Sequence, residues 1–450
     1  MNLSNKILYF LGIGGIGMSA LARWCAHQGA MIYGYDLQPT KLTDELISEG
    51  MIVHFTSDIS LIPKNIDFVV YTPAIPSDDI EYLHFIESKT PMIKRAELIG
   101  KISHDITTIA IAGTHGKTSI SALTAHILKN ANLNISAFVG GICRNYNTNL
   151  ILSDSTDYLV LEADEYDRSL LQIEPNIAVI SSMDEDHLDI YADKNDIKNT
   201  FIEFSKKIDD GGVLIYNSTI GPFDLSNIKK LSYSGGNPAS IHASNIRITE
   251  GVYIIDIDAN GTPIKNISIQ IPGLHNIENT LAAVAIGLEL GLTPDEIKSG
   301  IETFQGVERR MDYRIKNDRV IYIDDYAHHP EEIKVTVDTI KELYPNKKIT
   351  GIFQPHLYSR TRDFAKEFAG QLSKLDEVII MDIYPAREKP IPGITSEIIS
   401  DSIVGTKCQT LKPKEILNYL SNNNPQVVLT MGAGDINMMV EKIENTLSTI

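Results

Sequence analysis

Three segments of the chain begin with a short apolar run that ends in a turn and is followed by a helical pattern. These runs cover residues 6–10, 108–112 and 319–324. Further short apolar runs occupy residues 68–71, 158–162, 177–181, 348–353, 377–381 and 427–431. Apolar strands that alternate with helices are typical of parallel sheets covered on both faces. The pattern therefore predicts an α/β fold with doubly wound parallel sheets.

Two stretches rich in polar or turn-forming residues divide the chain into three parts. The first lies near residues 103–105 and the second near residues 305–307. A chain of 450 residues is longer than one hydrophobic core usually supports, which agrees with three domains. We expect these domains at residues 1–105, 106–308 and 309–450.

The pattern changes between Val213 and Pro272, where apolar and polar positions alternate, as in residues 252–257. Asn260 and Gly261 lie between two such runs, and this dipeptide favours a tight hairpin turn. We therefore expect a small antiparallel extension of the central domain.

Composition and charge exclude several classes of protein. Apolar residues make up 43% and charged residues 22%, which is ordinary for a folded globular protein. The formal charge of -18 argues against nucleic-acid partners, because such proteins usually carry a basic excess. No run approaches the ~20 apolar residues that a membrane helix requires. Cys25, Cys143 and Cys408 lie far apart without metal-like spacing, which suits a reducing cytoplasm.

A glycine-rich loop follows the first predicted strand. Gly12, Gly14 and Gly17 form the pattern G-x-G-x-x-G, and Asp36 ends the next apolar run. Glycines let backbone amides approach a pyrophosphate, and the start of the following helix favours negative charge. NAD is the obvious ligand, although any nucleotide diphosphate would meet the same amides. Asp36 either contacts a ribose or is a solvated acid at the end of a strand.

A second phosphate-loop pattern lies in the central part, between residues 108–112 and a helical pattern at residues 119–129. The loop consists of Gly113, Thr114, His115, Gly116, Lys117 and Thr118. A strand, loop and helix with Gly-Lys-Thr place amides and an ammonium around nucleotide phosphates, with the threonine hydroxyl on Mg²⁺. Ile111 occupies the first-glycine position of the common spacing, which indicates a family with its own shortened loop.

Acidic residues follow two of the predicted strands in the same part of the chain. Glu162 ends the run at residues 158–162, and carboxylate oxygens at such a position suit Mg²⁺. Residues 163–169 are so acidic that we expect most of these acids to be solvated or to support others. His187 follows the next strand within the acidic residues 184–187. It is either a structural histidine or a metal ligand, and its place near a metal carboxylate favours the ligand.

Motifs along nearly the whole chain resemble those of the Mur ligases. The matching segments are residues 12–18, 71–75, 95–97, 113–118, 162–165, 184–187, 275–279, 306–310, 324–330, 354–356, 360–362 and 432–435. Chance does not produce so many matches in one order. Within this family, the chain is similar to the branch that joins L-alanine to UDP-N-acetylmuramate with ATP, at the start of peptidoglycan peptide synthesis.

The resemblance implies an N-terminal UDP-sugar domain, a central ATPase and a C-terminal Rossmann-like domain that binds the amino acid and closes over the site. It implies that the glycine loop holds the diphosphate of a UDP-sugar in place of NAD. The implied UDP-sugar residues are Gly12, Gly14, Gly15, Ile16, Gly17, Met18, Asp36, Thr72, Pro73, Ala74 and Arg95. The family members act in the cytoplasm without a membrane partner, and we expect the same of this chain. We expect it to be a monomer or a homodimer.

The resemblance also assigns the nucleotide and metal residues. The implied ATP contacts are Gly113, Thr114, His115, Gly116, Lys117, Thr118, Ser119, His275, Asn276, Asn279, Arg310, Asp324 and Tyr326. The implied ligands of Mg²⁺, or of Mn²⁺ in its place, are Thr118, Glu162 and His187. The implied catalytic residues are Lys117, His187, Arg310, His328, His356 and Arg360.

The last three of these residues are expected to face the incoming amino acid. Either His328 or His356 would accept the proton of the attacking amine, and the sequence does not rank them. Several members of the alanine-adding branch carry an arginine where this chain has Leu357. The amino-acid carboxylate is therefore expected to depend on Arg360, helped by His356.

The implied reaction activates a carboxylate. The muramate carboxylate attacks the γ-phosphate of ATP to give an acyl phosphate and ADP, and the amine of alanine then displaces phosphate. A murein-tripeptide recycling ligase of the same family shares most of these motifs and is the main alternative. An NAD-dependent oxidoreductase would explain the glycine loop but would leave Lys117 and Glu162 without a role.

Overall fold

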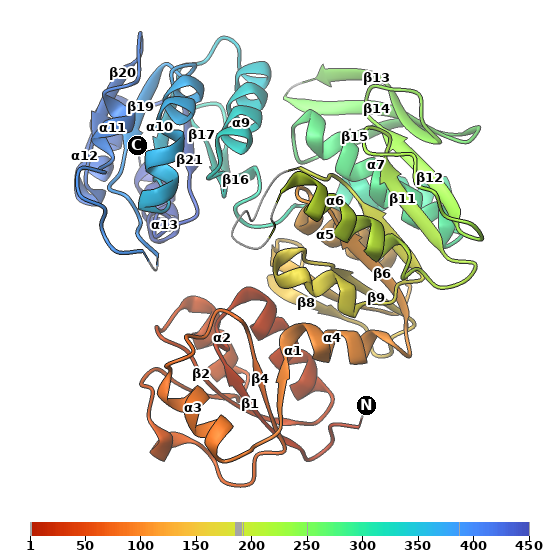
Figure 1. The fold of residues 1–450 in the computed structure, drawn as a ribbon. Coiled ribbons are helices and arrows are strands. Elements are labelled where there is room, and N and C mark those ends of the chain that lie inside the picture. Colours follow the sequence, from red (N-terminus) through yellow and green to blue (C-terminus); the bar gives the residue numbers. More distant parts are fainter. Residues whose placement is uncertain (1, 185–190, 192, 250, 387, 450) are drawn as a thin grey trace. The chain divides into compact units, whose positions relative to one another are not determined.

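The computed structural model describes residues 2–184, 191, 193–249, 251–386 and 388–449 (Figure 1). This part of the chain divides into two compact units. The first unit comprises Met1–Asn245, Ile255–Ile267 and Ile277–Gln305, and the second comprises Ile246–Ile254, Ser268–Asn276 and Gly306–Ile450. The described strands form three sheets.

The N-terminal sheet has five parallel strands in the order β3-β2-β1-β4-β5. Its strands are β1 (Ile7–Leu11), β2 (Met31–Tyr35), β3 (Ile52–His54), β4 (Phe68–Tyr71) and β5 (Met92–Lys94). The helical segments between and after them are α1 (Ile16–His27), α2 (Lys41–Ser48), η1 (Ile59–Leu61), α3 (Ile80–Glu87) and α4 (Arg95–Ser103). Leu8 and Phe10 belong to one core cluster and Tyr9 and Leu11 to another, so both faces of β1 are buried. A strand buried on both faces is apolar throughout, which is why the sequence predicted it within one residue.

The central sheet has ten strands in the order β15-β14-β13-β12-β11-β10-β6-β9-β7-β8. Its strands are β6 (Thr107–Ala112), β7 (Ile135–Cys143), β8 (Thr148–Leu152), β9 (Tyr158–Glu162), β10 (Ile177–Ile180), β11 (Val213–Asn217), β12 (Lys229–Ser234), β13 (Ile241–Thr249), β14 (Val252–Ala259) and β15 (Thr262–Ile269). The helical segments of this part are α5 (Lys117–Asn130), η2 (Tyr166–Gln172), α6 (Lys194–Ser205), α7 (Leu274–Glu289) and α8 (Pro294–Thr303). The strand pairs β7–β9, β9–β6, β6–β10, β10–β11 and β11–β12 are parallel, whereas β8 is antiparallel to β7.

The predicted antiparallel extension between Val213 and Pro272 is wrong at its start. Strands β11 and β12 pair in parallel, and so does the beginning of β13 with β12. Alternating polar positions in these strands reflect a partly exposed face of a parallel sheet, which periodicity alone does not distinguish from an antiparallel strand. The predicted hairpin turn is confirmed, because Asn260 and Gly261 connect β14 to β15 with φ of 51° and 86°.

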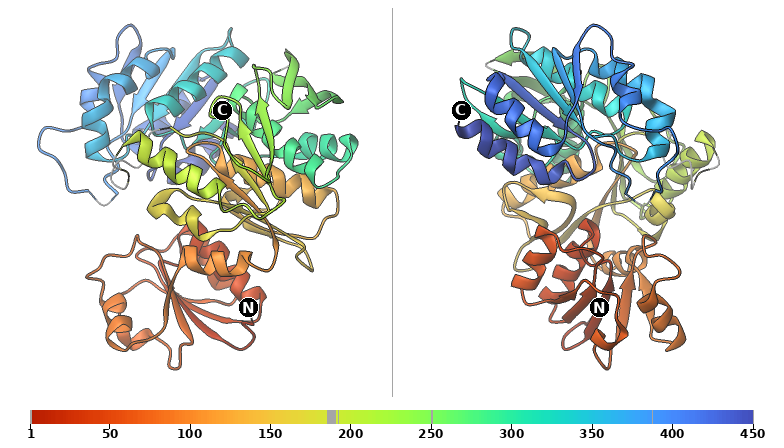
Figure 2. Two further views of the ribbon diagram at one scale, coloured as in Figure 1. Left: turned by 45° about the vertical axis from the view of Figure 1, so that its right-hand side comes forward. Right: turned by 90° about the vertical axis from the view of Figure 1, so that its left-hand side faces the viewer.

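The C-terminal sheet has six strands in the order β16-β17-β21-β18-β19-β20, and only β16 is antiparallel to its neighbour. Its strands are β16 (Asp312–Lys316), β17 (Ile321–Asp325), β18 (Ile349–Phe353), β19 (Glu377–Ile380), β20 (Lys407–Thr410) and β21 (Val427–Met431). Its helices are α9 (Pro330–Leu343), α10 (Tyr358–Leu372), α11 (Glu397–Ser400), α12 (Pro413–Asn423) and α13 (Asn437–Thr449). Apolar residues of α12 and α13 share a core cluster with one face of β17, β18, β19 and β21, and Phe353 of β18 packs on Phe368 of α10 from the other face. Helices therefore cover this sheet as expected for a doubly wound fold (Figure 2).

Strand β17 begins two residues later than the predicted run at residues 319–324. The side chain of Asn317 accepts hydrogen bonds from the amides of Arg319 and Val320, so these residues form a turn after β16. The short strand β16 was not predicted. It has only one sheet neighbour and carries Arg314 and Lys316, so it lacks the apolar signal of a buried strand.

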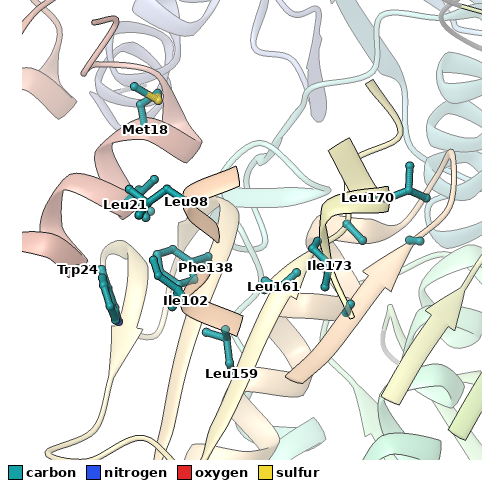
Figure 3. Packing of buried hydrophobic residues seen from close by; sticks show 14 of the residues in the cluster. Met18, Leu21, Trp24, Leu98, Ile102, Phe138, Leu159, Leu161, Leu170 and Ile173 are labelled. Carbon is teal, nitrogen blue, oxygen red and sulfur yellow. The ribbon is translucent and has the colours of Figure 1, made fainter. Parts of the chain in front are cut away.

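One hydrophobic cluster joins the first two sheets within the first unit. Figure 3 shows Leu21 and Trp24 of α1 and Leu98 and Ile102 of α4 together with Phe138 of β7 in this cluster. These side chains are at most 6% exposed, so the packing is closed to water. The helix that follows the glycine loop is therefore part of the same core as the strands around the nucleotide loop.

A buried polar network adds to this connection. Asn149 of β8 donates hydrogen bonds to the carbonyl of Ile16 (2.6 Å) and to the hydroxyl of Ser19 (2.8 Å). Its side-chain oxygen accepts a hydrogen bond from Arg23 Nη1 at 2.6 Å, and Glu49 takes two further donors of the same guanidinium. The network fixes the start of α1 against the central sheet.

No helix in the described ranges is both long enough and apolar enough to cross a membrane.

Candidate functional site

The glycine loop lies between β1 and α1 and is braced by Asp36. The amide of Gly14 donates a hydrogen bond to Asp36 Oδ2 at 2.7 Å. A Cβ atom on Gly14 would lie 2.9 Å from the same oxygen, so a larger residue would displace the carboxylate. Gly12 has a φ of 80°, and a Cβ there would lie 3.2 Å from Ile75 Cδ1 and 3.4 Å from Thr72 Cγ2. The structure thus places the loop after β4 against the glycine loop, and the implied UDP-sugar contacts of both loops stay predictions.

Arg95 is the first residue of α4, and its side chain lies against Gly17 in the first turn of α1. A Cβ atom on Gly17 would lie 2.2 Å from Arg95 Nη1, so the guanidinium rests directly on this glycine. Arg95 Nη2 is 3.5 Å from Asp164 Oδ2. Met18 is 3% exposed and belongs to the core, so an anion in the loop would meet its backbone and not its side chain. Amides at a helix start together with an arginine form a site suited to a diphosphate.

The nucleotide loop connects β6 to α5 and requires its glycines. Gly113 has a φ of 126°, and a Cβ there would lie 2.1 Å from Ser181 Oγ. Gly116 precedes α5 with a φ of 84°, and a Cβ there would lie 2.5 Å from Asn279 Oδ1. A glycine has no side chain with which to cap the helix, so the first amides of α5 are suited to an anion. Asn279, one of the predicted ATP residues, lies beside this loop.

Lys117 forms a buried ion pair that the sequence did not predict. Its ammonium donates to Glu165 Oε2 at 2.7 Å, to Glu165 Oε1 at 2.9 Å and to the carbonyl of Gly113 at 2.8 Å. The side chain of Glu165 is 1% exposed, so it is not one of the solvated acids that we expected in residues 163–169. Burial by itself would lower the pKa of Lys117, but Glu165 and Asp164 raise that pKa above its ordinary value.

Glu162 and Thr118, two of the predicted metal ligands, lie together. The hydroxyl of Thr118 donates to Glu162 Oε2 at 3.3 Å. Ser121 and the amide of Gly140 donate to Glu162 Oε1 at 3.2 and 2.6 Å, and burial raises the pKa of this carboxyl. A hydroxyl and a carboxylate beside a phosphate loop are oxygen ligands of the kind that Mg²⁺ takes, so the residues present fit such an ion. His187 lies outside the described residues, and the described ones contain no cluster of three or more metal-binding side chains.

Thr114 and His115 attach the nucleotide loop to the segment after β10. The hydroxyl of Thr114 donates to the carbonyl of Asp184 at 3.2 Å and accepts a hydrogen bond from the amide of Asp184 at 3.0 Å. The amide of His115 donates to Ser182 Oγ at 2.9 Å, and its ring lies 3.4 Å from the carboxylate of Asp184. The carboxyl ends of β6 and β10 therefore meet at this loop, which is the edge where parallel sheets bind ligands.

In the second unit, two predicted ATP residues at the end of β17, Asp324 and Tyr326, contact arginine side chains. Asp324 is 0% exposed and accepts hydrogen bonds from Arg309 Nε at 3.1 Å and from Thr430 Oγ1 at 2.6 Å. The ring of Tyr326 lies 5.3 Å from the guanidinium of Arg309 and 5.2 Å from that of Arg310. Asp324 thus anchors Arg309 in the described arrangement, and its predicted contact with a ribose stays a prediction.

His275 and Asn276 lie at the start of α7, also in the second unit. Asn276 Nδ2 donates to the carbonyl of Pro272 at 2.7 Å. Burial lowers the pKa of His275 to about 4, and the charge of Arg310 acts in the same direction. In the described part of the chain, the buried Nδ1 of His275 has no hydrogen-bond partner.

The three residues expected at the amino acid come together near the start of α10. The rings of His328 and His356 are 5.9 Å apart, and His328 Nδ1 lies 3.2 Å from Glu332 Oε2. Burial lowers the pKa of His356 to about 4, with His328 and Arg360 adding to the effect. His356 Nδ1 and Arg360 Nη1 are buried without a hydrogen-bond partner among the residues described. The guanidinium of Arg360, together with a His356 tautomer that carries its hydrogen on Nδ1, is suited to an anion such as a carboxylate.

Three family models match this chain in sequence order. Residues 7–107 match the Mur ligase family, catalytic domain, residues 111–287 the Mur ligase middle domain, and residues 309–434 the Mur ligase, glutamate ligase domain. A protein of Phocaeicola vulgatus named UDP-N-acetylmuramate--L-alanine ligase is 45% identical over 446 residues, which are 97% of each chain. The chain belongs to the Mur ligase family. Membership in this family leaves no support for the oxidoreductase interpretation.

Solved structures of Mur ligases agree with this assignment. The UDP-N-acetylmuramate-alanine ligase of Thermotoga maritima is 26% identical, with a TM-score of 0.85 and 99% of both chains covered. A murein peptide ligase of Psychrobacter arcticus has a TM-score of 0.71 over 99% of both chains. At 20% identity the latter shows a shared fold alone. The predicted α/β class with three Mur ligase parts is confirmed.

The sequence did not predict several residues of these sites in the Mur ligase fold. Glu332 pairs with His328 across one turn of α9, and this spacing of four residues was a usable signal. Glu165 was one acid among several in residues 163–169, and only the fold shows that it is the one that pairs with Lys117. Arg309 lies in the matching segment 306–310, but the sequence assigned it no role.

Proposed function

We propose that this chain is an ATP-dependent ligase that joins L-alanine to UDP-N-acetylmuramate during peptidoglycan synthesis. The main support is that the glycine loop, with Arg95 against it, and the nucleotide loop, with Lys117, lie in one compact unit. A protein that only bound a nucleotide would need one such loop. The named relatives support the choice of a ligase and of alanine.

The proposed domains are residues 1–105 for the UDP-sugar, residues 106–308 for ATP and residues 309–450 for the amino acid. The UDP-sugar would contact the glycine loop, Asp36, the loop at Thr72 and Arg95. Amides of the glycine loop and the guanidinium of Arg95 would bind its diphosphate. This arrangement would leave the muramate carboxylate free to reach the second loop.

The first chemical step brings two anions together. The muramate carboxylate attacks the γ-phosphorus of ATP, the bond to the β-phosphate oxygen breaks, and ADP leaves. Lys117, the first amides of α5 and Arg310 would neutralise charge on the transferring phosphoryl group. Thr118, Glu162 and His187 would hold Mg²⁺, or Mn²⁺ in its place, which supplies further neutralisation.

The second step forms the amide bond. The amine of alanine attacks the carbonyl of the acyl phosphate, and inorganic phosphate leaves. His356 and Arg360 would bind the alanine carboxylate, and a neutral His328 or His356 would accept the proton that the amine loses. Burial lowers the pKa of both histidines, so both are neutral and able to accept a proton at neutral pH. The proposed enzyme acts in the cytoplasm as a monomer or a homodimer.

The test measures ADP formation with single components omitted. We expect turnover only when UDP-N-acetylmuramate, ATP, Mg²⁺ and L-alanine are all present. A parallel reaction replaces L-alanine by the tripeptide that a recycling ligase attaches. Preference for the tripeptide, or brisk ADP release without the UDP-sugar, would contradict the proposal.

A further inference from the structure

Helix α10 begins without a capping side chain of its own. Its N-cap residue is Leu357, which cannot accept a hydrogen bond from the first amides of the helix. A distant residue takes this role. The amide of Ser359 donates to Glu388 Oε2 at 2.9 Å, and the hydroxyl of Ser359 donates to Glu388 Oε1. A carboxylate at the first turn of a helix also interacts favourably with the helix dipole.

Leu357 itself has an unusual backbone conformation. Its φ of 71° lies in the left-handed region, which a branched side chain rarely adopts. Such a conformation persists only where the surrounding structure holds it. The amide of Leu357 donates to the carbonyl of Tyr384 at 2.9 Å, and Tyr384 lies in the same loop after β19 as Glu388. Two contacts from this loop therefore hold the start of α10.

The buried polar atoms without a hydrogen-bond partner among the residues described, His356 Nδ1 and Arg360 Nη1, lie shortly before and after Leu357. His356 precedes Leu357 and stacks on the ring of Tyr384 with 5.7 Å between centroids, while Arg360 lies in the first turn of α10. The direction of both side chains depends on the backbone at Leu357. A change there would alter the placement of His356 relative to Arg360.

We propose that Glu388 is a positioning residue of the amino-acid site, which holds the first turn of α10 so that His356 and Arg360 together meet the substrate carboxylate. This inference rests on the proposed function. Glu388 does not bind the substrate carboxylate itself, because two negative charges repel. Both of its oxygens are also taken by Ser359.

The first test replaces the charge and keeps the shape. Glu388→Gln should raise the KM for L-alanine by roughly tenfold, the usual effect of losing a charge-assisted hydrogen bond. The KM values for ATP and UDP-N-acetylmuramate should stay within about twofold, because the loops proposed for their phosphates lie in the first unit and Glu388 hydrogen-bonds Ser359, which is not among the implied ATP residues. The matched control is Glu397→Gln, since Glu397 is an exposed acid in the first turn of α11. This control should leave all three constants unchanged.

Two further variants separate positioning from general stability. Ser359→Ala should raise the KM for L-alanine in the same way. The double variant with Glu388→Gln should raise this KM little further, because both substitutions remove the same interaction. Glycine adopts a φ of 71° without strain, so Leu357→Gly in the Glu388→Gln background should recover much of the alanine affinity. A residue that only stabilised the fold would show no such rescue.

The outcomes distinguish this inference from the proposed function. If the unaltered protein forms no ADP with L-alanine, the proposed function fails. If it does so and Glu388→Gln leaves the alanine KM unchanged, the positioning role is wrong. A rise of all three KM values together with a lower unfolding temperature would also overturn it. If Glu388→Gln does not fold, the three KM values of Ser359→Ala are compared in its place, and an unchanged alanine KM would show that the positioning role is wrong.

Discussion

Lys117 and Glu165 form a buried ion pair in which the ammonium lies 2.7 Å from Glu165 Oε2. An ammonium has three N–H donors, and the two oxygens of Glu165 together with the carbonyl of Gly113 accept from Lys117. A phosphate that binds Lys117 must therefore replace one of these contacts. In the described arrangement, Glu165 occupies the partner position that the proposed function gives to a nucleotide phosphate.

Glu165→Gln should make the protein less stable and more responsive to nucleotide. Breaking one partner of a buried ion pair commonly costs about 3–5 kcal/mol, since the remaining charge stays buried. A bound triphosphate would supply the missing negative charge. A nonhydrolysable ATP analogue with Mg²⁺ should therefore raise the unfolding temperature of the variant by more than that of the unaltered protein.

Thermal unfolding with and without the analogue measures this effect. Glu203→Gln on the exposed face of α6 is the matched control and should respond like the unaltered protein. An equal temperature shift in Glu165→Gln and in the control would contradict the competition between Glu165 and the phosphate.

Lys117→Ala should abolish ligation while leaving UDP-sugar binding nearly intact. Loss of one preorganised charge contact of this kind commonly lowers the rate on the order of 10²-fold or more. Lys117 contacts Gly113 and Glu165, whereas the glycine loop is braced by Asp36 and Arg95. Titration calorimetry with UDP-N-acetylmuramate checks the second half of the prediction. A parallel collapse of UDP-sugar affinity would mean that the two loops do not act separately.

Arg360→Lys should raise the KM for L-alanine by roughly tenfold, because a lysine cannot replace a planar guanidinium that binds a carboxylate with two donors. In the described part of the chain, Arg360 Nη1 is buried without a hydrogen-bond partner, as expected of a donor that binds a ligand. Leu357 supplies no second charge next to it. Steady-state kinetics with each substrate varied in turn decide the matter. Similar shifts in kcat and in both KM values would instead indicate that Arg360 supports the domain.

The protein should become less stable at mildly acidic pH, because the buried ring of His126 resists protonation in the folded state. Its ring lies 2.9 Å from the hydroxyl of Tyr146 and 3.0 Å from that of Thr303, and burial lowers its pKa to about 4. The unfolded chain takes up a proton near pH 6.5, before the folded protein does, so unfolding gains protons between these values. The stability from neutral His126 is present above about pH 6.5 and is lost as the pH falls toward 4.

His126→Gln removes this titration and should flatten the fall in stability. Urea unfolding midpoints at about pH 7, 6 and 5 compare the variant with His104→Gln, whose side chain is exposed. The prediction fails if His126→Gln and His104→Gln show the same slope between about pH 6.5 and 4.

The positions of the buried strands and of both phosphate loops were predictable from the sequence. Strands β4, β9 and β21 have the predicted bounds, because their central positions are buried on both faces and apolar. Glycines at 12, 113 and 116 marked the loops, since their positive φ values leave little choice of residue. The parallel pairing of β11 with β12 was not predictable, because alternation along one strand does not reveal the direction of its neighbour.

The sequence by itself determined the α/β class and the family, and it supplied the candidate residues of each site, because these depend on local patterns and on motifs in a fixed order. Only the tertiary structure decided which charges pair. Glu165 holds Lys117, Arg309 holds Asp324, and Glu388 caps a helix that begins 30 residues before it. Such partners come from different strands and loops and carry no periodic signal. Their pairing follows from the place at which the fold brings two distant segments together, which no single segment of the chain specifies.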